Sequence, residues 1–220
     1  MKLDYAAVRA SDEIRTYITQ ADASLIAMGY TEHSFAHVAK CAETAAGLLS
    51  QLGYDERQVE LAKIAGYMHD IGNVVNRVDH AQSGAVMAFR ILDKMGMDPE
   101  DVAVVVTAIG NHDEHTAFPV NAVAAALILA DKTDVRRSRV RNRDTISFDI
   151  HDRVNYAVTD QTLKIDLDKK VISLNLQIDT DICSMYEYFE IFLQRMLMCR
   201  GAADMLGATF KLTANGAKVL

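Results

Sequence analysis

The 220-residue chain contains no tryptophan, only two prolines and eleven glycines, so few of its positions interrupt a helix. Alanine, leucine, methionine and charged residues are abundant instead, and this composition favours helix. Half of the residues are hydrophobic, which is enough for a buried core and argues against disorder over most of the chain. The length suits one large domain, or one domain with a modest extension.

Long apolar runs are also missing. The longest uncharged apolar run, residues 120–130, is too short for a membrane span, which needs roughly 20 residues. Asp4 stands where a signal peptide would begin its apolar stretch. The three cysteines, Cys41, Cys183 and Cys199, lie far apart and form no Cys-x-x-Cys motif, so we expect reduced core residues. We therefore expect a cytoplasmic protein that contacts no membrane.

The formal net charge of −7 argues against non-specific binding of nucleic acid by the molecule as a whole. A local basic cluster nevertheless follows residue 131. Its arginines are Arg136, Arg137, Arg139, Arg141 and Arg143.

Hydrophobic periodicity and capping residues predict a helical body up to about residue 160. The clearest helix start is Asp98, followed by Pro99 and Glu100: a capping residue, a first-position proline and a first-turn acid. Asp55 is a second candidate cap. The expected helices cover residues 11–28, 34–52, 55–69, 81–95, 98–110 and 121–140.

The pattern changes after about residue 160. Residues 163–168 and 171–179 alternate apolar and polar side chains on either side of Lys169-Lys170, which predicts a β-hairpin. A helix over 182–206 and a strand over 209–213 are expected to follow. We thus expect a mainly α fold with a helical domain at 1–160. An α+β extension at 161–220, a short antiparallel sheet plus a helix, is expected to pack on it or on a partner, as a homodimer surface or a lid.

Three of the seven histidines are directly followed by aspartate: His69-Asp70, His112-Asp113 and His151-Asp152. Adjacent side chains on a regular helix point about 100° apart, so they do not easily share one ion. His69-Asp70 closes an apolar helix and precedes Gly72, where the chain can leave the helix and the two side chains can converge. This pair is the best candidate for a metal anchor. His151-Asp152 has no such glycine, and we expect no role for it.

Residues 33–72 (HSFAHVAKCAETAAGLLSQLGYDERQVELAKIAGYMHDIG) resemble the opening of the HD-domain superfamily of metal-dependent phosphohydrolases. In that pattern a histidine precedes the His-Asp pair by a helix and a loop, and an aspartate follows late in an apolar helix. His37 and Asp131, the latter in AALILADKTD, occupy these places. The resemblance covers about residues 33–135. It implies that His37, His69, Asp70 and Asp131 bind a metal ion, with Asp70, His69 and Asp131 as the catalytic residues.

Members of that superfamily with two metals add two histidines between the His-Asp pair and the last aspartate. His80, in DHAQSGAVMAFRIL, and His112, in IGNHDEH, are similar to these. The resemblance then implies a second ion on His80 and His112, with Asp70 bridging; a core or surface role is the alternative for both histidines. His33 lies one helical turn before His37. We expect it to be a capping or solvated histidine rather than a further ligand.

An imidazole and carboxylate set without thiolate suits one or two ions of Mn, Fe, Co, Ni or Zn. Such an ion acidifies a bound water towards neutral pH and neutralises charge on phosphoryl oxygens. Asp134 and Asp113 are candidates for holding the ligands in place. We therefore expect hydrolysis of a small phosphorylated substrate, with nucleotides among the candidates and nucleic acid excluded.

Phosphate recognition requires cations near the metal. Lys132 follows the last expected ligand, and Arg136 shares its side of the expected helix by the four-residue step. We expect both to contact substrate; a solvated arginine face is the alternative. Many relatives carry lysine directly after His-Asp-Ile-Gly, where this chain has Asn73, so Arg77 is expected to supply that contact. His115 is near enough to reach a substrate as well.

Two other functions stay open. A few HD-type proteins bind a pair of iron ions and cleave C–C or C–P bonds as oxygenases. A metal-bearing scaffold that senses a nucleotide without turnover is the other alternative, although the complete ligand set argues against it. The residues after His112 (DEHTAFPV) lack the Gly-Tyr-Pro motif of cyclic-dinucleotide phosphodiesterases, so that substrate is not assigned.

Overall fold

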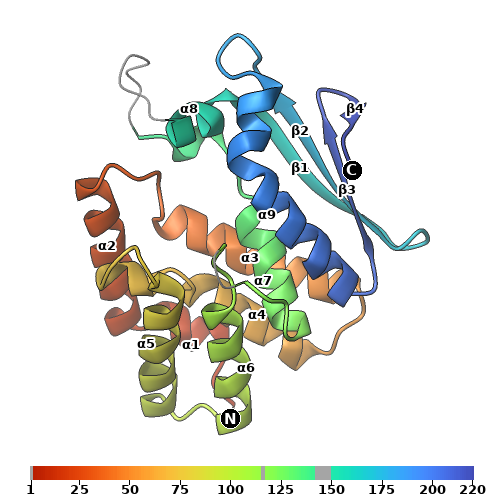
Figure 1. Cartoon of the computed structure of the whole chain (residues 1–220). Coiled ribbons are helices and arrows are strands. Elements are labelled where there is room, and N and C mark those ends of the chain that lie inside the picture. Colours follow the sequence, from red (N-terminus) through yellow and green to blue (C-terminus); the bar gives the residue numbers. More distant parts are fainter. Residues whose placement is uncertain (1, 115–116, 142–149) are drawn as a thin grey trace.

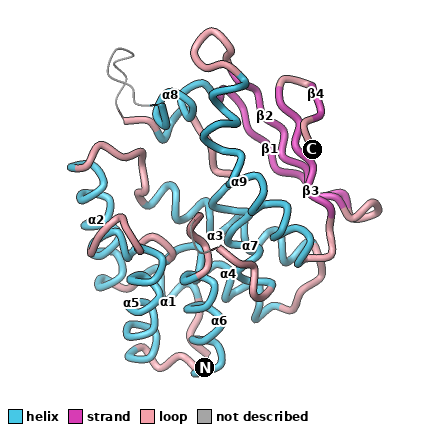
Figure 2. Tube along the Cα trace, in the orientation of Figure 1, coloured by secondary structure: helices cyan, strands magenta, loops and turns pink. Residues whose placement is uncertain are grey.

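The computed structural model describes residues 2–114, 117–141 and 150–220. A body of helices occupies most of the molecule, and the strands gather at one side of it (Figure 1). All of these strands come from the C-terminal part of the chain (Figure 2). The described helices are α1 (Tyr5–Ala10), α2 (Asp12–Ala27), α3 (Phe35–Gln51), α4 (Glu56–Met68), α5 (His80–Lys94), α6 (Pro99–Gly110), α7 (Ala122–Lys132), α8 (Ile150–Ala157) and α9 (Met185–Met205). The expected mainly helical fold is confirmed.

The predicted helix starts are confirmed where a capping side chain marks them. The Asp55 carboxylate accepts a hydrogen bond from Gln58 N at the start of α4, and Asp98 accepts one from Glu100 N at the start of α6, with Pro99 at the first position. These bonds satisfy backbone N–H groups that have no partner inside the helix. Sequence patterns predicted neither α1 nor α8, because six and eight residues are too few to show a helical period.

The long helix predicted over 121–140 is wrong in its second half, because α7 ends at Lys132. The Thr133 hydroxyl donates to Leu129 O, and a short 3₁₀ turn at Arg137–Arg139 follows. Arg139 donates to the backbone oxygens of Glu32 and Asp134, so the chain turns back towards the loop before α3. Lys132 and Arg136 therefore do not share one helical face.

The sheet is mixed rather than antiparallel. The predicted hairpin of β1 (Val158–Asp166) and β2 (Val171–Ile178) is confirmed. β3 (Thr209–Ala214), however, pairs parallel to β2, because α9 carries the chain back across the sheet before β3 begins. β4 (Ala217–Lys218) closes the order β1-β2-β3-β4 by pairing antiparallel to β3.

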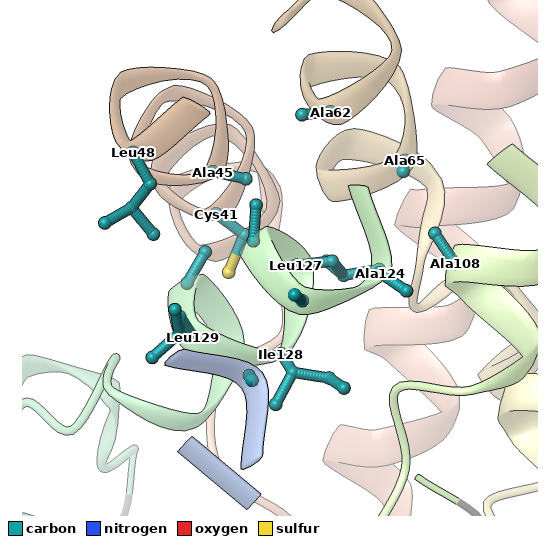
Figure 3. Packing of buried hydrophobic residues seen from close by; sticks show 14 of the residues in the cluster. Cys41, Ala45, Leu48, Ala62, Ala65, Ala108, Ala124, Leu127, Ile128 and Leu129 are labelled. Carbon is teal, nitrogen blue, oxygen red and sulfur yellow. The ribbon is translucent and has the colours of Figure 1, made fainter. Parts of the chain in front are cut away.

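The core centres on α7, which is buried on almost every side, as expected for a helix without a polar face. It packs against α3, α4, α6 and α9. Figure 3 shows side chains of α7, among them Ala124 and Leu127, beside small residues of α3 and α4. α9 also contacts β3, so buried residues of the sheet and of the helical body join one hydrophobic cluster. None of the described helices has both the length and the apolar composition of a membrane span.

Two glycines allow the close approaches that assemble the site. A Cβ added to Gly66 in α4 would lie 2.7 Å from the backbone of Ala42 in α3. A Cβ added to Gly72 would lie 2.0 Å from His80 O at the start of α5. Gly72 has no positive φ and lies in a 3₁₀ turn, Ile71–Val74. Its place after His69-Asp70 therefore reflects a lack of space rather than a left-handed helix end.

Candidate metal centre

The six side chains expected to bind metal lie in one cluster, and five of them are buried with Asp131 partly exposed. They come from separate parts of the chain: His37 from the first turn of α3, His69 and Asp70 from directly after α4, His80 from the start of α5, His112 from just after α6 and Asp131 from the last turn of α7. The close contacts of α3 with α4, and of α5 with the turn after Asp70, bring these segments together.

One group of donor atoms forms around His37, His69 and Asp131. His37 Nε2 lies 3.4 Å from Asp131 Oδ1 and 3.6 Å from Asp70 Oδ2. His69 Nε2 lies 3.2 Å from Asp70 Oδ2 and 3.8 Å from Asp131 Oδ1. Imidazole nitrogens and carboxylate oxygens of four residues thus point at one spot.

A second group adjoins the first. The Nε2 atoms of His80 and His112 are 3.2 Å apart, and His80 Nε2 lies 3.6 Å from Asp70 Oδ1. The two carboxylate oxygens of Asp70 therefore face different histidines: Oδ2 faces His37 and His69, and Oδ1 faces His80.

The histidines are oriented by hydrogen bonds at their outer nitrogens. Each Nδ1 lies within hydrogen-bond distance of an oxygen acceptor, which fixes the neutral ring as the tautomer whose Nε2 lone pair points inward. These pairs are His37 with Asp134 Oδ2 (2.8 Å), His69 with Gly66 O (2.9 Å), His80 with Arg77 O (3.1 Å) and His112 with Ile109 O (2.6 Å). In this tautomer, four Nε2 lone pairs directed at two carboxylates make a donor set for a transition-metal ion.

A cation also fits the unsatisfied atoms of the cluster. Within the described ranges, His69 Nε2 and Asp70 Oδ2 are fully buried and have no hydrogen-bond partner. Leaving such atoms unpaired costs about 1–3 kcal/mol each. A divalent ion between them would satisfy both, so the residues present fit a metal.

The electrostatics of the centre favour ionised carboxylates. Burial by itself raises the pKa of Asp70, but the neighbouring histidines hold that pKa well below its usual range. Lys132 and His37 do the same for the pKa of Asp131, again against the effect of burial. Burial lowers the pKa of His112 to about 3, assisted by His69 and Lys132. Neutral imidazole and ionised carboxylate are the forms that bind metal.

Cys41, which was expected to be a core residue, also lies in the cluster. Its Sγ lies 3.6 Å from His37 Nδ1, and Cys41, His37, His69 and Asp131 each offer a ligand atom within 4.8 Å of the others. Burial raises its pKa well above the usual value, so the group remains a thiol in the absence of a metal. Its spacing of four residues from His37 on α3 was a signal that could have placed it here.

Of the residues expected to contact substrate, some line the pocket beside the centre and others do not. Lys132 is buried, forms an ion pair with Asp131 Oδ2 at 2.7 Å, and lines the pocket beside the centre, as does Arg77. Arg136 instead binds both carboxylate oxygens of Asp134, at 2.6 and 3.0 Å, and is absent from the described lining of that pocket. His115 and Arg143 lie outside the described residues.

The pocket over the candidate metal centre has a volume of about 560 Å³. Asp70, His80 and Asp131 open into it, and His33 lines it as well. Its wall also contains four residues for which no role was expected: His151, Asp152 and Asn155 from α8, and Arg195 from α9. His151-Asp152 is the His-Asp pair for which no role was expected, and no local motif marks Asn155 or Arg195. The packing of distant segments brings all four residues to the pocket.

Comparison with known proteins agrees with this geometry. Residues 34–137 match the family model described as HD domain. The chain is also similar to ribonuclease Y of Opitutus terrae, with 30% identity over 112 residues, or 51% of this chain. The match spans only 20% of that relative's length.

Proposed function

We propose, from the premise that residues 34–137 are an HD domain, that this chain is a metal-dependent phosphohydrolase acting on a small phosphate ester. The observation that carries the proposal is the cluster itself. Its histidine Nε2 atoms face two carboxylates whose pKa values are lowered. Among the described residues, the buried atoms His69 Nε2 and Asp70 Oδ2 have no hydrogen-bond partner.

We assign the ligands in two groups. His37, His69 and Asp131 would hold one ion, His80 and His112 a second, and Asp70 would contribute one oxygen to each. Mn, Fe, Co, Ni and Zn suit such ligands. A divalent ion here supplies Lewis-acid activation of water and neutralises phosphoryl charge. The split orientation of Asp70 supports two ions. His80→Ala would then lower metal content by half, whereas unchanged content would leave a single ion.

Lys132 and Arg77 are the cations proposed to bind phosphoryl oxygens. The Lys132 ammonium is held 2.7 Å from Asp131 Oδ2, so its charge lies beside a proposed ligand. Arg77 Nη1 donates to Asn73 Oδ1 at 3.2 Å and its guanidinium lies 5.7 Å from the Tyr30 ring centroid. A pocket of about 560 Å³ lies in the usual range for small-molecule sites, roughly 300–1,000 Å³.

A second candidate is cleavage of a phosphodiester, because the matched relative is named a ribonuclease. The net charge of −7 speaks against a large nucleic-acid footprint, since phosphate backbones require clustered cations. We therefore prefer a phosphomonoester of a small metabolite.

The test is a substrate panel with protein loaded with Mn or with Fe. We expect turnover of p-nitrophenyl phosphate and of nucleoside monophosphates, and little turnover of bis-p-nitrophenyl phosphate or single-stranded RNA. A preference for the diesters would favour the second candidate, a phosphodiesterase, over the monoesterase. Dioxygen-dependent turnover with iron and no hydrolysis would favour an oxygenase, and tight nucleotide binding without turnover would favour a sensing scaffold.

A further inference from the structure

Part of the pocket wall lies outside the segment that matches the HD domain. Residues 34–137 supply the metal cluster, whereas α8 and α9 supply His151, Asp152, Asn155 and Arg195. A ligand held at the cluster would therefore also face side chains from the C-terminal part of the chain.

Asn155 lies in this part of the wall and carries an amide oxygen that can accept a hydrogen bond. It is only 6% exposed, and its Nδ2 donates to His151 O at 2.8 Å, which identifies the other amide atom as oxygen. Among the described residues, no donor reaches Asn155 Oδ1. Asn155 lines the pocket, and its Oδ1 is not among the fully buried atoms that lack a partner. This oxygen is therefore accessible from the pocket, and a bound ligand can supply the donor.

α8 is held firmly enough to present Asn155 in one position. Arg137 Nε donates to Tyr156 O at 2.6 Å, and its guanidinium lies 4.6 Å from the Tyr156 ring centroid. Arg153 pairs with Glu187 of α9 at 2.6 Å. A contact that is fixed before binding costs little conformational entropy when the ligand arrives.

We propose that Asn155 is a specificity-determining residue that accepts a hydrogen bond from the leaving group of the phosphate ester. This inference rests on the proposed function for the phosphoryl end of the pocket. The favoured substrates carry an O–H or N–H donor beyond the phosphoryl group, such as a sugar hydroxyl or a nucleobase amine. An ester such as p-nitrophenyl phosphate offers no such donor and gains nothing from Asn155.

The test compares kcat/KM of metal-loaded wild type and Asn155→Ala for three substrates. We expect a loss of about tenfold or more for AMP or ribose 5-phosphate, and less than about twofold for p-nitrophenyl phosphate. A loss shared by both sugar phosphates would place the donor on the ribose, and a loss confined to AMP would place it on the base. Gln51→Ala is the matched control, because Gln51 makes the same amide-to-carbonyl bond, to Gly47 O at 3.0 Å, on exposed surface; it should leave all three values unchanged.

An equal loss of kcat/KM on all three substrates would indicate a structural role and would overturn the proposal. An unchanged kcat/KM on all three would overturn it as well. If Asn155→Ala does not fold, Asn155→Leu, which keeps the branching at Cγ but removes the polar atoms, is measured in the same way. If wild type hydrolyses none of the three, the proposed function fails, and calorimetric titration with AMP and ribose 5-phosphate tests Asn155 separately. Binding that weakens in the variant supports the specificity role, whereas equal or absent binding overturns it.

Discussion

Asp134 shows how a single residue outside the proposed ligand set can orient the proposed metal centre. Its carboxylate accepts from His37 Nδ1 at 2.8 Å and from Arg136 Nε at 2.6 Å, and Lys40 Nζ lies 2.9 Å away. Burial by itself raises the pKa of Asp134, but the hydrogen bonds from His37 and Arg136 hold that pKa well below its usual range. An ionised Asp134 keeps the Nδ1 hydrogen on His37 and directs Nε2 at the cluster.

Asp134→Asn removes the charge that fixes this tautomer. We expect the Kd for Mn or Zn to rise by about 10- to 100-fold, the usual effect of losing such a partner. Competition with a chelating dye measures this Kd. Asp166→Asn, which breaks an exposed pair with Lys169, serves as the control and should not change the Kd. An unchanged Kd in Asp134→Asn would contradict the assigned role.

His112 gives a prediction for stability against pH. Burial lowers its pKa to about 3 from an ordinary value of 6.5. As pH falls below 6.5, the unfolded chain therefore takes up a proton that the folded chain does not, and stability declines until pH approaches the folded pKa. In metal-free protein, His112 should lower the free energy of unfolding by about 1.5 kcal/mol between pH 6.5 and pH 5.

Urea unfolding of metal-free protein at these two pH values measures that cost. His112→Gln cannot take up the proton, so its free energy of unfolding should decline by less over this range. The wild type and the variant would decline in parallel if His112 were not titrating in this way.

Between elements, the approach of α3 to α4 sets the distance between His37 and His69. Gly66→Ala would place a methyl group 2.7 Å from the Ala42 backbone, and the two helices would have to separate. We expect a loss of about 1–3 kcal/mol of stability and weaker metal binding, measured by thermal unfolding and by dye competition.

Gly47→Ala is the matched control, because it lies within α3 with no contact closer than 4.0 Å, to the end of the Gln51 side chain. Alanine there should stabilise the helix by about 0.5–1 kcal/mol. A Gly66→Ala variant as stable as the wild type would show that the close approach of the two helices is dispensable.

The sequence predicted those elements whose signals are local. α4 and α6 followed from their caps, and the hairpin followed from strict alternation. The end of α7 at Lys132 did not, because the partners that turn the chain back, Glu32 and Asp134, become neighbours of Arg139 only in the folded protein. The parallel pairing of β2 with β3 depends likewise on where α9 docks.

At the candidate site too, the sequence predicted what local motifs mark and missed what only packing brings together. The six proposed ligands were expected from motifs and their resemblance to a family, and the structure brings them together. Asn155 and Arg195 were not expected, because their relevance comes only from the packing of α8 and α9 over the pocket.

For the whole molecule, we propose that the helical domain and the extension are one folding unit. α9 packs on α7 and contacts β3, and buried residues of both parts belong to one cluster. A chain cut after residue 160 would expose the α7 surface that α9 covers. We expect that fragment to be insoluble or partly unfolded by circular dichroism. A soluble, cooperatively folding fragment would contradict this and favour two separate domains.

The central claim is that imidazoles and carboxylates from distant segments bind divalent cations together. The most direct test is elemental analysis of freshly purified protein, wild type and Asp70→Ala in parallel. We predict one or two transition-metal ions per wild-type chain and almost none in the variant, with unchanged helix content. A wild type that holds no metal even after reconstitution, or a variant that holds as much as the wild type, would contradict the account.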